Sequence, residues 1–159
     1  MRAMFIRHDV HVDQSANSCR RELLEPPERW LPAAVTGVSG ERRFLARVGF
    51  SAPASRISKQ VELTVGAPEE QGDWLVVPLA WRATGPGQLF PVLDGKLTIQ
   101  PLGPHSSKLS LSGTYEPPLG AVGREIDQAV LHGVAEATIR DFVESVAARL
   151  SELAASRPA

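Results

Sequence analysis

Apolar and polar residues alternate along much of the chain before residue 117, with the period of two that half-buried strands show. Residues 4–12 place every second side chain on one apolar face, with His8 as the polar exception. The same pattern predicts strands at residues 43–50, 57–65, 74–83, 96–101 and 108–116. Because short turn-forming segments separate most of them, we expect antiparallel neighbours with one face of the sheet in water. Pro78 inside the fourth strand indicates an edge position or a bulge, since proline cannot donate a ladder hydrogen bond.

Helical spacing replaces this alternation in two regions. Residues 13–24 are predicted to be helical, with Asp13 or Ser15 available as the N-cap and two prolines directly afterwards. A short turn that follows would bring Trp30 to the core. From about residue 124 to 153, apolar residues recur every three or four positions, which predicts one helix roughly 45 Å long. A helix of that length must cross the whole apolar face of the sheet.

One connection is too long to be a simple turn. Residues 84–95 (TGPGQLFPVLDG) hold Leu89, Phe90 and Val92 between glycines and prolines. An apolar loop of this length is usually a lid or a packed flap. We therefore expect these three side chains to cover the mouth of any internal cavity.

Composition fits a single domain. The chain has 159 residues, of which 43% are hydrophobic, and this is enough to build a core without disulfides or a structural metal. We expect residues 1–153 to form one domain and residues 154–159 to be a disordered tail. The single cysteine and four scattered histidines form no metal-ligand pattern, so we expect neither a metal nor another cofactor.

Charge and hydropathy narrow the classes of partner. With 17 basic and 18 acidic side chains the net charge is −1, which disfavours nucleic-acid binding. No apolar run approaches the ~20 residues that a membrane span needs. The polar residues 7–9 interrupt the short apolar start, so no signal peptide is predicted and a cytoplasmic location is expected.

The order of these elements is a strand, two short helices, a run of antiparallel strands and one long C-terminal helix. This α+β layout resembles the helix-grip fold of the START-like, or SRPBCC, superfamily, in which a curved antiparallel sheet wraps around one long helix. The resemblance rests on residues 6–12 followed by 16–24, on PPERWLP at residues 26–32, and on the ending LSLSGTYEPPLGAVG…VAEATIRDFVESVAARL. It implies a cavity between sheet and helix that holds an apolar ligand. On this resemblance and on strand parity, the expected ligand-binding residues are His8, Phe44, Val48, Leu63, Leu79, Trp81, Phe90, Leu97, Ile99, Leu111, Tyr115, Leu131, Ala135, Thr138 and Phe142.

Two of these residues are also candidates for catalysis. The imidazole group is the usual acid/base group of proteins near neutral pH, and His8 shares a face with Ile6 and Val10, but a lone inward histidine is more often structural. Tyr115 combines an apolar ring with a hydroxyl group near the expected end of the cavity, which suits a ligand contact as well as ordinary packing. His132 is expected on the outer flank of the long helix, without a partner.

Three functions stay open. The first is binding of a small hydrophobic molecule, such as a lipid, a quinone or a polyketide-like compound, between the sheet and the C-terminal helix. The second is an enzyme of the polyketide cyclase/dehydratase type, for which His8 and Tyr115 would have to converge on one cavity. The third is a module that binds another protein through an exposed apolar patch around Trp74 and Val76. The sequence leaves open whether the chain is a monomer or a homodimer.

Overall fold

The computed structural model describes residues 4–32, 35–40, 42–52, 55–84, 92–116 and 128–157. Within these residues eight strands form one antiparallel sheet, in the order β1-β8-β7-β6-β4-β3-β2, with β5 paired to β6. The strands are β1 (Met4–Val12), β2 (Val35–Gly40), β3 (Arg43–Ala52), β4 (Ser55–Val65), β5 (Glu69–Gln71), β6 (Trp74–Ala83), β7 (Val92–Gly103) and β8 (Ser106–Glu116). The helices are α1 (Ala16–Leu23), α2 (Pro27–Trp30) and α4 (Gln128–Ser156). No helix among the described residues combines the length and the apolar character needed to cross a membrane.

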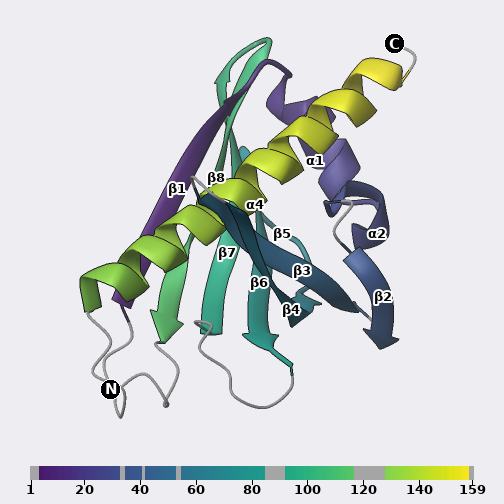
Figure 1. Ribbon diagram of the computed structural model, residues 1–159. Helices are drawn as coiled ribbons and strands as arrows, with labels where there is room; N and C mark the ends of the chain where they lie inside the picture. The colour runs from purple at the N-terminus through teal and green to yellow at the C-terminus, as the bar shows by residue number, and fades with distance from the viewer. Residues whose placement is uncertain are drawn as a thin grey trace.

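The long helix α4 lies diagonally across one face of the curved sheet, with α1 and α2 beside its C-terminal half (Figure 1). This arrangement confirms the predicted α+β helix-grip fold. Strand parity explains it, because the inward positions of the strands are apolar and form one continuous core with the inner face of α4. At 29 residues α4 is about 44 Å long, which is enough to span the sheet.

The register aligns inward side chains in rows across the sheet. One row joins Tyr115, Leu93, Trp81, Leu63 and Phe44, from β8 across to β3. All five side chains are almost completely buried. The first three residues of this row, Tyr115, Leu93 and Trp81, form the floor beneath the first described turns of α4, where the candidate site lies.

For Pro78 the sequence indicated an edge position or a bulge. The edge position is wrong, because β6 lies inside the sheet between β7 and the β4/β5 side. Its position nevertheless suits a residue without an N–H group. The pairing of β6 with β4 ends at Leu79 and its pairing with β5 begins at Val76, so Pro78 lies in the gap between them. At this gap the Gly66 amide donates to the Pro78 carbonyl oxygen at 2.8 Å.

The short helices pack where the sequence placed them. Ser15 is the N-cap of α1, and its hydroxyl oxygen accepts from the Ser18 amide at 3.1 Å. Trp30 at the end of α2 is fully buried. The helix α4 ends at Ser156, three residues beyond the predicted end at 153. The single-domain organisation stays a prediction.

A buried carboxylate ties the C-terminal end of α4 to both short helices. Glu22 on α1 is fully buried and pairs with Arg29 on α2 at 3.0 Å and with Arg157 at 2.7 Å. Arg157 also pairs with Glu25 at 3.3 Å. Burial alone would raise the pKa of Glu22, but the two arginines outweigh it and hold that pKa below its usual value. The chain therefore closes this end of the molecule with a charged cluster.

Candidate functional site

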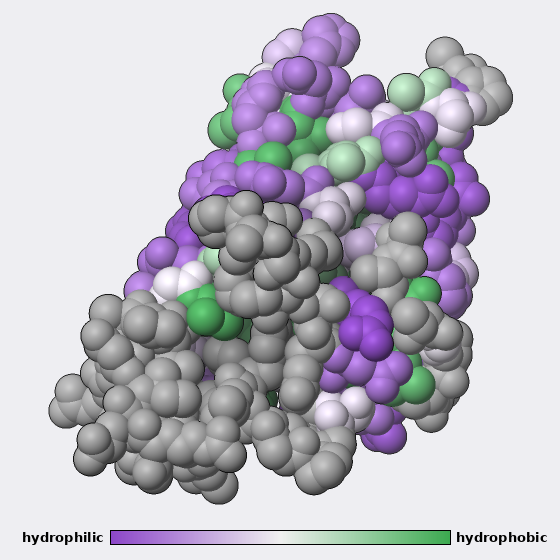
Figure 2. Space-filling model, in the orientation of Figure 1, coloured by the Kyte–Doolittle hydropathy of each residue, from purple (hydrophilic) through white to green (hydrophobic). Residues whose placement is uncertain are grey.

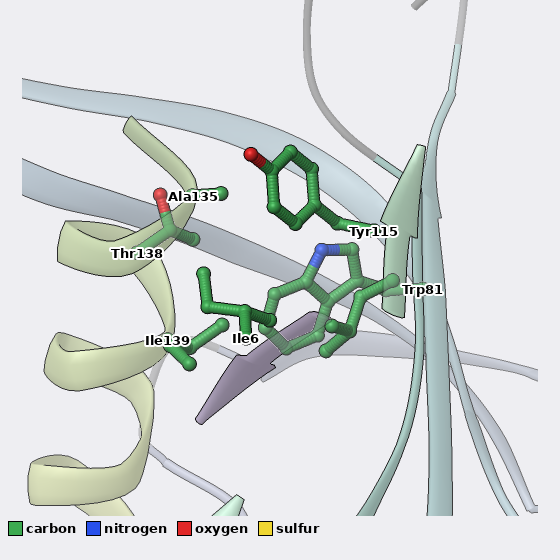
Figure 3. Close-up of a pocket in the computed structure, with 7 residues that line it drawn as sticks. Ile6, Trp81, Tyr115, Ala135, Thr138 and Ile139 are labelled. Atoms are coloured by element: carbon green, nitrogen blue, oxygen red, sulfur yellow. The ribbon is translucent and has the colours of Figure 1, made fainter. Parts of the chain in front are cut away.

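A small cavity lies between the sheet and the first described turns of α4 (Figure 3). Its volume open to a water-sized sphere is about 10 Å³, which is about what one water molecule needs. Strands β1, β6, β7 and β8 and helix α4 all contribute to its walls. The lining residues are Ile6, Trp81, Leu93, Tyr115, Ala135, Thr138 and Ile139.

The cavity exists where the apolar face of α4 passes over aromatic side chains of the sheet. Trp81 from β6 meets Phe142 from α4 edge-on, with ring centroids 5.2 Å apart. On the helix side the small residue Ala135 leaves space, and the Thr138 hydroxyl is turned back to the Val134 carbonyl oxygen at 2.7 Å. The site is therefore apolar at its centre, as ligand pockets usually are.

A chain of polar contacts leads from the wall of this cavity to the protein surface. The Tyr115 hydroxyl lies 2.8 Å from Nδ1 of His132 and 3.1 Å from Sδ of Met4. Nε2 of His132 lies 2.7 Å from Oε1 of Glu136, one helical turn further along α4. Tyr115 is 1% exposed, while the side chains of His132 and Glu136 are 35% and 59% exposed. A buried phenol is thus connected to solvent through an imidazole and a carboxylate.

Burial raises the pKa of Tyr115, and the negative charge of Glu136 raises it further. The phenol therefore keeps its proton at neutral pH. It acts in this site as a neutral hydroxyl group, not as a phenolate.

The sequence predicted only part of this Tyr115–His132–Glu136 arrangement. Tyr115 was a candidate, but His132 was expected on the outer flank of α4 without a partner, and that expectation was wrong. The signal that could have found it is the i,i+4 spacing of His132 and Glu136, which places both on one side of the helix. The contact with Tyr115 depends on how α4 packs over β8, which spacing alone does not give.

The other catalytic candidate lies elsewhere. His8 is half-buried on β1 and faces Glu144 of α4, with Nε2 to Oε1 at 3.7 Å. Tyr115 pairs with Met4, four residues before His8, which corresponds to about 13 Å along the strand. Their partners on α4, Glu144 and His132, are separated by about 18 Å of helix. The structure does not bring His8 and Tyr115 together, so joint proton transfer by these two groups loses its basis.

The remaining predicted ligand residues fall into three groups. Trp81, Tyr115, Ala135 and Thr138 line the cavity, and Ile6, Leu93 and Ile139 join them although none of the three was in the predicted set. A second group is buried in the common core away from this lining: Phe44, Val48, Leu63, Leu79, Leu97, Ile99, Leu111 and Phe142. Phe90 and the side chain of Leu131 lie outside the described residues.

The predicted loop at residues 84–95 is shorter than expected, because β7 begins at Val92. Val92 pairs with Glu116, and its parity is opposite to that of inward Leu93. It therefore lies on the outer face of the sheet and does not cover the cavity. Leu89 and Phe90 lie outside the described residues, so their role as a cover stays a prediction.

The outer face of the sheet carries a wider hollow of about 350 Å³. Its lining mixes both signs of charge, with Arg82 among Glu62, Asp94 and Glu116. The register places Arg82 beside Glu62, and Asp94 beside Thr114. Such a charged, outward surface does not suit the apolar ligand that the sequence predicted.

The apolar patch expected around Trp74 and Val76 does not form. Trp74 is 46% exposed, whereas Val76 is buried beside Glu69 of β5. Figure 2 shows the α4 side of the molecule, where described hydrophobic residues occur in small separate groups among hydrophilic ones, and not the outer face of the sheet. The partner-binding hypothesis therefore loses the contiguous surface that it required.

Comparison with known proteins supports the fold and leaves the function open. No protein-family model matches the chain, and no curated protein sequence matches it. A conserved protein from Geobacillus kaustophilus has a similar structure, with a TM-score of 0.62 and 16% sequence identity over 94% of this chain and 96% of that one. A START superfamily protein from Mycobacterium smegmatis gives a TM-score of 0.56 and 17% identity, over 94% of this chain and 98% of that one. The Zhui aromatase/cyclase from Streptomyces sp. R1128 gives a TM-score of 0.55 and 12% sequence identity, over 98% of this chain and 96% of that one.

These likenesses extend over nearly the full length of each chain. The protein therefore has the START-like, helix-grip fold.

Proposed function

We propose that this protein binds a small apolar molecule between the inner face of the sheet and helix α4. The observation that carries the proposal is the apolar cavity under the first described turns of α4, with Trp81 and Tyr115 on one side and Ala135 and Ile139 on the other. Large aromatic walls with few polar groups are typical of sites for apolar ligands.

The structural neighbours support the same reading. One of them is an aromatase/cyclase and another belongs to the START superfamily, so this scaffold occurs in proteins with small-molecule chemistry. A shared fold does not by itself transfer an activity, and the residues of this site must carry the argument.

The size of the cavity sets a condition on binding. Space for about one water cannot hold a ligand of ring size, so uptake requires the walls to separate. The row Tyr115–Leu93–Trp81 is fixed in the interior of the sheet by hydrogen-bonded neighbours on both sides. Separation is therefore expected on the helix side, where α4 contributes Ala135, Thr138 and Ile139.

Binding of N-phenyl-1-naphthylamine, a neutral apolar fluorescent probe, tests this proposal, together with native mass spectrometry of the purified protein for a co-purified ligand. Ala135→Val adds two methyl groups to the cavity wall and is expected to weaken probe binding by about tenfold or more, since it narrows the space that the ligand needs. Ala155→Val is the matched control, because Ala155 is exposed near the end of the same helix and has the same change in helix propensity. Absence of probe binding to the wild type, or equal binding by the wild type and Ala135→Val, would contradict the proposal.

A further inference from the structure

The hydrogen bonds around Tyr115 have a direction that restricts which polar group a ligand can present. The Glu136 carboxylate accepts hydrogen bonds and cannot donate one. Nε2 of His132, 2.7 Å from that carboxylate, must therefore carry a hydrogen. In the neutral imidazole this leaves Nδ1 without a hydrogen, as an acceptor.

The phenol has one hydrogen to give, and Nδ1 at 2.8 Å is positioned to take it. Thioether sulfur is a much weaker acceptor, so Met4 Sδ at 3.1 Å does not compete for that hydrogen. The Tyr115 oxygen is then left with lone pairs that need a donor. A thioether has no hydrogen to donate, so Met4 covers this oxygen without satisfying it.

Met4 is not among the residues that line the cavity, but it covers the phenol oxygen and is the neighbour of that oxygen that can yield. It is half-buried on the first described residue of β1, and methionine has three rotatable bonds and a soft, adaptable side chain. A ligand group that displaces Met4 Sδ reaches the phenol oxygen directly. The Thr138 hydroxyl, the other hydroxyl in the lining, already donates to the Val134 carbonyl oxygen.

We infer that Tyr115, oriented by His132 and Glu136, is the polar recognition point of the cavity, and that it selects apolar molecules carrying a hydroxyl group, which donates to the Tyr115 oxygen. The inference rests on the proposed function and adds to it the class of ligand. Tyr115 is the contact residue, while His132 and Glu136 are positioning residues.

Three naphthalene compounds separate the possibilities, with affinities measured by fluorescence titration. 2-Naphthol donates and accepts, 2-methoxynaphthalene only accepts, and 2-acetonaphthone carries a carbonyl group that only accepts. The wild type is expected to bind 2-naphthol about tenfold more tightly than the methyl ether, which is the effect of one hydrogen bond in an apolar site. Tyr115→Phe is expected to reduce this ratio to about one while retaining affinity for the methyl ether.

His132→Leu gives a second, independent test at a partly exposed position. Without Nδ1 the phenol hydrogen is free, so this variant is expected to bind 2-acetonaphthone about threefold or more tightly than the wild type does. If His132 has a purely structural role, His132→Leu should bind all three compounds more weakly and to the same extent. His11→Leu is the control for loss of an imidazole, because His11 is exposed and pairs with Asp13 at 3.3 Å.

The outcomes distinguish this inference from the proposed function. If the wild type binds the alcohol and the ether equally, or if Tyr115→Phe keeps the tenfold preference, the hydroxyl-selective site is overturned while apolar binding stands. If the wild type binds none of the three compounds, both proposals are overturned.

Discussion

Gly95 on β7 and Gly113 on β8 lie directly opposite each other in the sheet, beside the row that forms the floor of the cavity. A Cβ atom on Gly95 would lie 2.6 Å from the Ser112 carbonyl oxygen, and one on Gly113 would lie 2.5 Å from the Cα of Gly95 and still closer to the Asp94 carbonyl oxygen. Neither distance leaves room for a side chain. The two strands therefore approach each other more closely than any residue other than glycine allows.

Gly113→Ala is expected to destabilise the protein by about 1–3 kcal/mol, because the added methyl group overpacks the backbone of β7. Gly133→Ala on α4 is the matched control, since nothing lies within 4 Å of its added Cβ. That control is expected to raise stability by about 0.5–1 kcal/mol through helix propensity. Chemical denaturation of both variants measures the difference, and equal stability would show that the strands can separate at no cost.

Glu22→Gln is expected to destabilise the protein at neutral pH by about 1.5–3 kcal/mol, because the charge-assisted bonds to Arg29 and Arg157 are lost. The pKa of Glu22 is lowered in the folded state, so its contribution is present above the ordinary glutamate pKa and is lost as the pH falls through the folded-state value. The difference in the free energy of unfolding between the wild type and Glu22→Gln should therefore disappear in acid. Urea denaturation of both proteins across a pH series measures this difference in the free energy of unfolding. A difference that does not change with pH would contradict this account.

Cys19 is expected to be inert in the native protein. It is fully buried against Ser107, with Sγ to Oγ at 3.7 Å, and burial raises the pKa of its thiol. Because it is the only cysteine, a thiol-labelling reagent reports on this one position. Labelling is expected to be on the order of a hundredfold slower or more than in guanidinium. A rate close to that of the unfolded chain would mean that α1 readily leaves the sheet.

Ser15→Ala is expected to cost about 1 kcal/mol, because the Ser18 amide loses its acceptor at the start of α1. Asn17→Ala is the comparison, since Asn17 is exposed and has no capping role. That change should stay within about 0.5 kcal/mol. Thermal unfolding of the two variants measures both changes in stability. Equal stability of Ser15→Ala and Asn17→Ala would contradict the role of Ser15 as a cap.

Strand periodicity carried most of the fold prediction. The strands predicted at residues 4–12 and 74–83 have the bounds of β1 and β6, because the inward positions of both strands are apolar in alternation, with His8 as the one exception. The strand β2 was missed since its sequence VTGVSG is short and contains two glycines, and its pairing with β3 shifts register twice. The exposed strand β5 has no apolar face to reveal it and depends on its pairing with β6.

The sequence predicted the candidate site less completely than it predicted the fold. Parity placed Trp81 and Tyr115 inward, and helical spacing placed Ala135 and Thr138 opposite them. Leu93 was assigned to a loop because glycines and prolines precede it, although pairing with Tyr115 makes it a strand residue. Contacts made through helix packing, such as that of Tyr115 with His132, require the angle and depth at which α4 crosses the sheet.

The pairing of β1 with β8 also has a consequence for synthesis on the ribosome. Met4 pairs with Tyr115, so the first strand to emerge is joined to the last strand of the sheet. Within the described sheet β8 is the neighbour of β1, and β1 must remain unpaired until nearly the whole sheet has been translated. Closing so long a loop makes the final step of folding late and slow. Nascent chains that end before β8 expose the edge of β7 and the apolar face of β1, and these shorter chains are the form of the protein most exposed to aggregation.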